Sequence, residues 1–251
     1  MGTLLTLLRK ELYLYAVSPL TYVVAAVFVG LCGFFFYTRL IVYSQFGFGW
    51  DILGNFWFSF LAGAPYSVST VLLLMCPLLT MRSFAEERRT GTLELLLTLP
   101  LGDAQLVLAK WLAALLVVEV ILGLLLPFLV ALHGLAAFPW QPAMAGFLGL
   151  VLLASAFVAA GVCFSACTSS QVIAAAATYG LLVLAWLVTW NEAAAGEPWM
   201  RVLREVSLFD RFEWFARGVV RSGDAAYFLA CTAFFLCLAG LVLGARRWRG
   251  K

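Results

Sequence analysis

The chain is poor in charge, in histidine and in the motifs that mark catalytic sites. Only 12% of its 251 residues are charged, where a soluble domain carries about 25%. The excess of 16 basic over 13 acidic residues is too small to indicate a nucleic-acid-binding protein. A single histidine cannot complete a metal or haem site, and the sequence has neither a Gly-x-Ser-x-Gly motif nor an acidic pair within an apolar run. We therefore expect no enzyme and no metal, cofactor or nucleic-acid site.

The sequence also lacks a phosphate-binding loop of the Gly-x-x-x-x-Gly-Lys-Ser/Thr type. Without such a loop, the chain is not expected to hydrolyse ATP by itself. The six cysteines lie within or beside apolar segments and not in polar loops with ligand spacing. This placement favours buried free thiols over disulfide bonds or a zinc site.

What the sequence has in abundance is apolar residues. Hydrophobic residues make up 64% of the chain, and its mean hydropathy is +1.01. A helix needs about 20 mostly apolar residues to cross the hydrocarbon core of a bilayer. We therefore predict an all-α integral membrane protein, a single transmembrane domain over residues 1–251. Its six spans are expected at residues 20–38, 64–81, 106–132, 143–166, 172–190 and 225–245.

The basic residues near the span ends indicate how the chain is oriented, because positive charge is concentrated in cytoplasmic loops. With the N-terminus inside, the cytoplasmic side receives Arg9, Lys10, Arg82, Arg88, Arg89, Lys110, Arg246, Arg247, Arg249 and Lys251. The short outer loops then carry only Arg39. The sequence predicts a multi-pass protein with both termini in the cytoplasm.

Residues 1–18 are expected to form a separate element before the first span. Leucines recur with helical spacing over Leu4–Tyr15, so one face of this helix is apolar and the other polar. Pro19 then separates it from the first span. The pattern is typical of an interfacial helix on the cytoplasmic surface, although a basic anchor that only sets the topology fits it equally well. Glu11 falls at the edge of the apolar face, and we expect its cationic partner in the Arg82–Arg89 segment.

Residues 82–105 form a charged segment between the second and third spans. Thr90-Gly91-Thr92 is expected to break the helix that leaves the second span. Thr92 can then cap a new helix over Leu93–Thr98, which Pro100 would end. The sequence predicts a short amphipathic helix on the cytoplasmic surface, a docking element for a partner. An ordinary solvated loop is the alternative, and it does not explain the capping residues.

Two further polar features lie in or beside the spans. Residues 191–224 alternate aromatic and charged side chains, which fits either a re-entrant helical hairpin broken near Ser207 or an aromatic belt at the outer interface. Glu119 lies inside the third span, where it could contact substrate, pair across a dimer or act as structural glue. We favour the last role, in which a protonated and hydrogen-bonded Glu119 holds neighbouring helices together.

The segment from Arg82 to Pro100, Arg-Ser-Phe-Ala-Glu-Glu-Arg-Arg-Thr-Gly-Thr-Leu-Glu-Leu-Leu-Leu-Thr-Leu-Pro, followed by Leu106 and Lys110, resembles a loop of type-2 ABC transporter permeases. That loop has an acidic-basic run, Gly-Thr, a hydrophobic-Glu-hydrophobic triplet and Ser/Thr-x-Pro. Two further motifs are similar to the gliding-motility-associated branch of these permeases. They are Arg9-Lys10-Glu11-Leu12 with Ser18-Pro19-Leu20, and Phe212-Glu213-x-Phe215-Ala216-Arg217-Gly218.

The resemblance implies a half-transporter in a bacterial inner membrane. It implies two copies of a cytoplasmic ATPase subunit that binds the ATP, a second permease copy or paralogue, and room for a periplasmic or membrane-anchored accessory subunit. By position in the motif, the ATPase-coupling residues would be Glu86, Glu87, Arg88, Thr90, Gly91, Thr92 and Glu94. An outer re-entrant element would contain Phe212, Glu213, Phe215 and Arg217.

The function expected from this resemblance is ATP-driven export by alternating access, powered by closure of the ATPase on the coupling helix. One alternative is the coupling subunit of a vitamin-type importer, which uses Ala-Arg-Gly motifs such as Ala216-Arg217-Gly218, here on the predicted outer side. Another is a scaffold that transmits ATP-driven motion to a periplasmic machine. Apart from Lys110 near the cytoplasmic end of the third span, Glu119 is the one charge within the expected spans, so the sequence mildly favours an amphiphilic, lipid-like or polymeric cargo.

Overall fold

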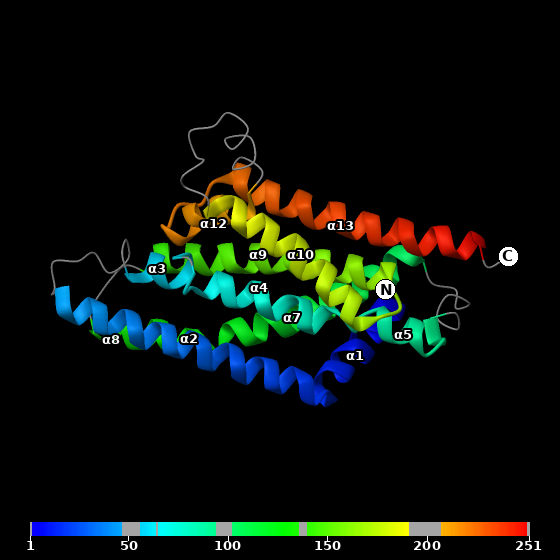
Figure 1. The fold of residues 1–251 in the computed structure, drawn as a ribbon, viewed down its shortest axis with the longest axis horizontal. Coiled ribbons are helices and arrows are strands. Elements are labelled where there is room, and N and C mark those ends of the chain that lie inside the picture. Colours follow the sequence, from blue (N-terminus) through cyan, green and yellow to red (C-terminus); the bar gives the residue numbers. More distant parts are fainter. Residues whose placement is uncertain are drawn as a thin grey trace.

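A computed structural model describes residues 2–46, 56–63, 65–93, 102–135, 140–190 and 207–249. Every regular element in these ranges is a helix, which confirms the predicted all-α class. The long helices run along the long axis of the molecule and form a bundle (Figure 1). Short helices lie at both ends of this bundle.

Five apolar segments in the described ranges are long enough to cross a membrane. They lie on helices α2, α4 with α5, α7 with α8, α9 and α13. The bounds of these helices are Pro19–Phe46, Val68–Thr80, Ala85–Arg89, Asp103–Gly123, Leu126–Leu135, Trp140–Cys167 and Ser222–Arg249. Helix α10, Gln171–Trp190, occupies the place of the expected fifth of six spans. Its apolar stretch Gln171–Leu187 is shorter than a full span, so a sixth crossing stays a prediction.

The boundaries of these helices follow local chemistry. Helix α2 runs past Thr38 to Phe46, because no proline or glycine stops it there. Helix α7 ends at Gly123 and α8 begins at Leu126, directly before Pro127, whose missing amide hydrogen interrupts the helical hydrogen bonds.

Helices α4 and α9 form the centre of the bundle. In each of these two segments, 72% of the most apolar stretch is buried inside the protein, against 22% in α2 and in α13. Helix α9 packs against α4, α7, α10, α12 and α13. Its glycines make this possible: a Cβ on Gly149 would lie 2.4 Å from Cβ of Phe215, and one on Gly161 would lie 2.0 Å from Oγ1 of Thr80. Small residues of this kind let membrane helices approach closely.

The two ends of the bundle carry different short elements (Figure 1). Helix α1, Gly2–Val17, and helix α5 lie at the same end as the C-terminal part of α13. Helices α3, Phe58–Leu61, and α12, Leu208–Ala216, lie at the opposite end. No element was predicted from the sequence over Phe58–Leu61, yet Phe60 and Leu61 within α3 are completely buried.

Candidate functional site: a buried charge cluster at the α1–α5 end

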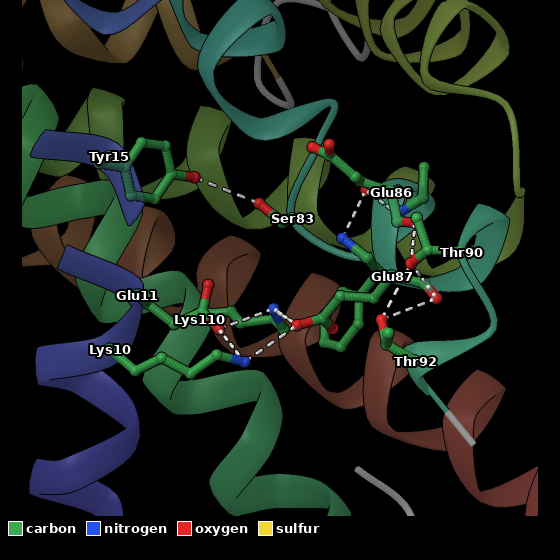
Figure 2. Close-up of polar contacts among 12 residues, drawn as sticks. Lys10, Glu11, Tyr15, Ser83, Glu86, Glu87, Thr90, Thr92 and Lys110 are labelled. Atoms are coloured by element: carbon green, nitrogen blue, oxygen red, sulfur yellow. Dashed lines mark hydrogen bonds and ion pairs between the residues drawn. The ribbon is translucent and has the colours of Figure 1, made fainter. Parts of the chain in front are cut away.

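A buried cluster of charged side chains lies where α1, α5 and α7 meet. Lys110 of α7 is only 2% exposed. Its Nζ lies 3.0 Å from Oε1 of Glu11 in α1 and 2.9 Å from Oε1 of Glu87 in α5 (Figure 2). We call these three residues the Lys110 triad. The aromatic ring of Phe84 lies 5.1 Å from the same Nζ, which adds a cation–π contact.

Lys10 closes the open side of the triad. Its Nζ lies 3.5 Å from Oε1 of Glu87 and 3.8 Å from Oε1 of Glu11. The side chain of Lys10 is 47% exposed, so these contacts are screened by solvent and weaker than those of Lys110. With Lys10 included, two lysines balance two carboxylates, and the cluster is electrically neutral.

The prediction for the ion-pair partner of Glu11 was wrong. We expected a cation from the Arg82–Arg89 segment, but Glu11 pairs with Lys110 of α7 and with Lys10 beside it. The reason is that α1 packs along the start of α7. The Arg82–Arg89 segment instead supplies Glu87, a second carboxylate on the same lysine.

The turn that leads into α5 is attached to α9 by a single hydroxyl. Oγ of Ser165 accepts hydrogen bonds from the backbone amides of Phe84, at 3.0 Å, and Ala85, at 3.1 Å. It donates to the carbonyl of Met81 at 3.1 Å. One hydrogen and two lone pairs are thereby all used. In addition, Nη1 of Arg88 donates to the carbonyl of Cys167 at the end of α9, at 2.9 Å.

Residues 90–92 close α5 with a threonine-rich turn. Oγ1 of Thr90 donates to the carbonyls of Glu86 and Glu87, at 3.0 and 3.2 Å, and lies 3.0 Å from Oγ1 of Thr92. Gly91 has a φ of 73°, a left-handed conformation that favours glycine. The expected helix over Leu93–Thr98, and Glu94 with it, falls almost entirely outside the described residues.

Tyr15 ties α1 to the end of α4. Its hydroxyl donates to the carbonyl of Leu79 at 3.2 Å and lies 3.4 Å from Oγ of Ser83. Burial raises the pKa of Tyr15 to about 12, because the phenolate would lose its hydration, and the negative charge of Glu11 adds to this effect. The phenol therefore stays protonated at physiological pH and keeps its hydrogen bond.

The residues predicted for the outer element lie at the other end of the bundle (Figure 1). Phe212 and Phe215 of α12 are completely buried. Arg217 is exposed, with its Nη2 3.4 Å from Oε2 of Glu213 and its guanidinium over the ring of Phe58. Oγ of Ser207 caps α12 by accepting from the amide of Asp210 at 3.3 Å. Residues 191–206, the first half of the expected hairpin, lie outside the described ranges.

Glu119 stands apart from both ends, inside α7. Its Oε1 is buried and has no hydrogen-bond partner among the residues that the structure describes. In the same ranges no three His, Cys, Asp or Glu residues come together as a metal site.

Sequence reasoning missed two parts of this site. Lys110 was noted as a cytoplasmic positive charge and as a position of the loop motif but not as a buried ion-pair partner, although a lysine inside the apolar run after Asp103 already indicates a buried partner. Ser165 gave no signal, because a serine within an apolar helix usually satisfies its own helix backbone.

The apolar helices of the bundle, five of them long enough to cross a membrane in the described ranges, define a multi-pass membrane protein. Comparison with protein families agrees. The family model for ABC-2 family transporter proteins matches residues 63–215, more than half of the chain. The chain therefore belongs to this family and is the membrane permease component of an ABC-2 type transporter, a class that works with an ATPase partner. A search among curated proteins finds no significant match.

Proposed function

We propose that the chain is the membrane half of an ATP-driven exporter and that a separate cytoplasmic ATPase acts on residues 82–105. The observation that carries this proposal is the attachment of the segment's first part. Glu87 joins it to Lys110 of α7 and to Lys10 of α1, and Ser165 and Arg88 join it to α9. When a segment attached in this way is displaced, the displacement is transmitted to several helices.

The Lys110 triad is the proposed transmission point. Its contacts are short and buried, so separating one carboxylate from Lys110 would leave a charge unpaired in a medium of low dielectric constant. Such a separation costs several times the thermal energy. We therefore infer that α1, α5 and α7 move together when the ATPase moves α5. That motion changes the side of the membrane to which the bundle opens.

The proposed topology places α1, α5 and the C-terminal end of α13 on the cytoplasmic side of a bacterial inner membrane. All three lie at one end of the bundle (Figure 1), and positive charge at this end agrees with cytoplasmic loops. We further propose two ATPase copies, a second permease copy or paralogue, and membership of the gliding-motility-associated branch. The motifs that support this branch are Arg9-Lys10-Glu11-Leu12 and Phe212–Gly218.

One observation weighs against the importer alternative. An importer of the vitamin type would present Ala216-Arg217-Gly218 to the ATPase, on the same side as the coupling segment. Here Ala216 ends α12, at the end of the bundle opposite to α5 (Figure 1). A scaffold that drives a periplasmic machine without moving a solute would use the same triad, and it remains the second candidate.

Co-purification tests the proposal. When the chain is expressed together with the products of its neighbouring genes, we expect a cytoplasmic ATPase to purify with it. Glu94→Arg should reduce the recovered ATPase about tenfold, because a reversed charge at a docking contact costs more than 1 kcal/mol. Glu213→Arg, the same reversal at the opposite end of the bundle, should leave recovery unchanged. Purification of the chain without any ATPase would overturn the proposal.

A further inference from the structure

A cleft of about 910 Å³ opens next to the Lys110 triad, between α1, the start of α2, the end of α4 and α5. Its lining includes the apolar side chains of Leu7, Leu14, Val17, Leu20 and Leu79. Charged groups and hydroxyls also line it. A volume of this size accommodates a ligand of several hundred daltons, and a lining that combines apolar with charged side chains fits an amphiphile.

The charges in the cleft are balanced but not all paired. Three cations, Lys10, Arg82 and Lys110, and three carboxylates, Glu11, Glu86 and Glu87, line it. Four of the six belong to the cluster around Lys110. Arg82 and Glu86 do not form an ion pair with any residue in the described ranges. Arg82 has one long hydrogen bond, 3.4 Å, to Oγ of Ser18. In Figure 2 the Glu86 carboxylate lies apart from the groups around Lys110.

An available cation and an available carboxylate in one neutral cleft match a ligand that carries both charges. A phosphate is bound well by the planar guanidinium of Arg82. The Glu86 carboxylate accepts hydrogen bonds, so it favours an ammonium group with N–H donors over a quaternary ammonium, which has none.

We propose that this cleft binds a phospholipid whose head group carries a primary amine. Its phosphate lies on Arg82, its ammonium on Glu86 and its upper acyl chain along Leu14, Val17 and Leu79. This inference rests on the proposed position of α1 at the membrane surface, because only there does a head group of the inner leaflet reach the cleft.

The exposed face of α1 supports a lipid occupant. Tyr13, Leu14 and Val17 are 68%, 50% and 61% exposed, and together they form an apolar patch at the rim of the cleft. Patches of this kind mark contact with membranes or with other proteins. A protein partner is the weaker match, because a cleft with three cations and three carboxylates offers no net charge to attract one.

Native mass spectrometry of the purified chain tests the proposal. The chain is incubated with equal amounts of phosphatidylethanolamine and phosphatidylcholine that have identical acyl chains. We expect phosphatidylethanolamine to be retained about fivefold over phosphatidylcholine, the effect of one partly exposed charge-assisted hydrogen bond. Glu86→Gln should abolish this preference, whereas Arg82→Gln should weaken retention of both lipids alike. Two controls outside the cleft, Arg89→Gln and Glu213→Gln, should match the unaltered chain.

Equal retention of the two lipids by the unaltered chain would overturn the proposal. So would a preference that survives Glu86→Gln, or a Glu86→Gln variant that loses the ATPase partner while its lipid binding is unchanged. The lipid measurement needs no ATPase, so the two proposals fail separately. If no ATPase co-purifies but the lipid preference responds to Glu86→Gln, the lipid site stands and only the proposed function is lost.

Discussion

Replacing Lys110 with methionine is expected to destabilise the protein by about 3–5 kcal/mol, because Glu11 and Glu87 would lose the cation that compensates their buried charges. Denaturant-induced unfolding in detergent micelles measures this loss. Lys10→Met is the matched control. Its side chain is 47% exposed, so its removal should cost less than about 1 kcal/mol.

A triple variant separates the charge effect from a packing effect. In Glu11→Gln/Lys110→Met/Glu87→Gln no buried charge of the triad remains, and the side chains keep nearly the same volume. Replacing a whole buried ion cluster by neutral groups is often close to neutral for stability. We therefore expect the triple variant to recover most of the stability that Lys110→Met loses. If Lys110→Met is as stable as Lys10→Met, the triad does not hold α5 to α1 and α7.

The second large effect is expected at the opposite end of the bundle, where Phe215→Ala should cost about 3 kcal/mol. Phe215 is completely buried and lies against Gly149 of α9, and its ring centroid is 6.1 Å from that of Phe228 in α13. Truncation leaves a cavity between α9, α12 and α13 that the helices cannot close. Thermal unfolding followed by size-exclusion chromatography measures the loss.

Phe234→Ala is the control for this experiment. Phe234 is 61% exposed on α13, so the same truncation removes few contacts within the chain. We expect a loss below about 1 kcal/mol. Equal losses at Phe215 and Phe234 would mean that α12 is not part of the packed bundle.

The sequence predicts those features of the structure that depend on neighbouring residues, and not those that depend on packing between distant ones. The all-helical class follows from long apolar runs, each of which can be recognised from its own residues. Hydropathy alone does not separate α4 and α9, which lie inside the bundle, from α2 and α13 at its periphery, because lipid and protein interior are equally apolar. The glycines of α9 hint at its central place only once their neighbours are known.

Of the residues that join helices at the candidate site, two were named from the sequence, as expected ATPase-coupling residues. Motif positions indicated Glu87 and Arg88, whose side chains make the contacts that join α5 to α7 and α9. The ion pair between Lys110 and Glu11 was not predicted. These residues are 99 positions apart, and only the packing of α1 on α7 brings them together. Phe56 and Trp57 were missed for a similar reason. They read as part of a loop until the packing of α3 shows that both are buried.

The central claim is that motion of α5 reaches α1 through the Lys110 triad, and hydrogen–deuterium exchange of the permease–ATPase complex tests it most directly. A non-hydrolysable ATP analogue should change deuterium uptake in α5 and α1 together in the unaltered protein. In Glu11→Gln/Lys110→Met/Glu87→Gln the change should remain in α5 and disappear from α1. An α1 response of the same size in both proteins would contradict the claim, as would a complex in which the nucleotide leaves α5 unchanged.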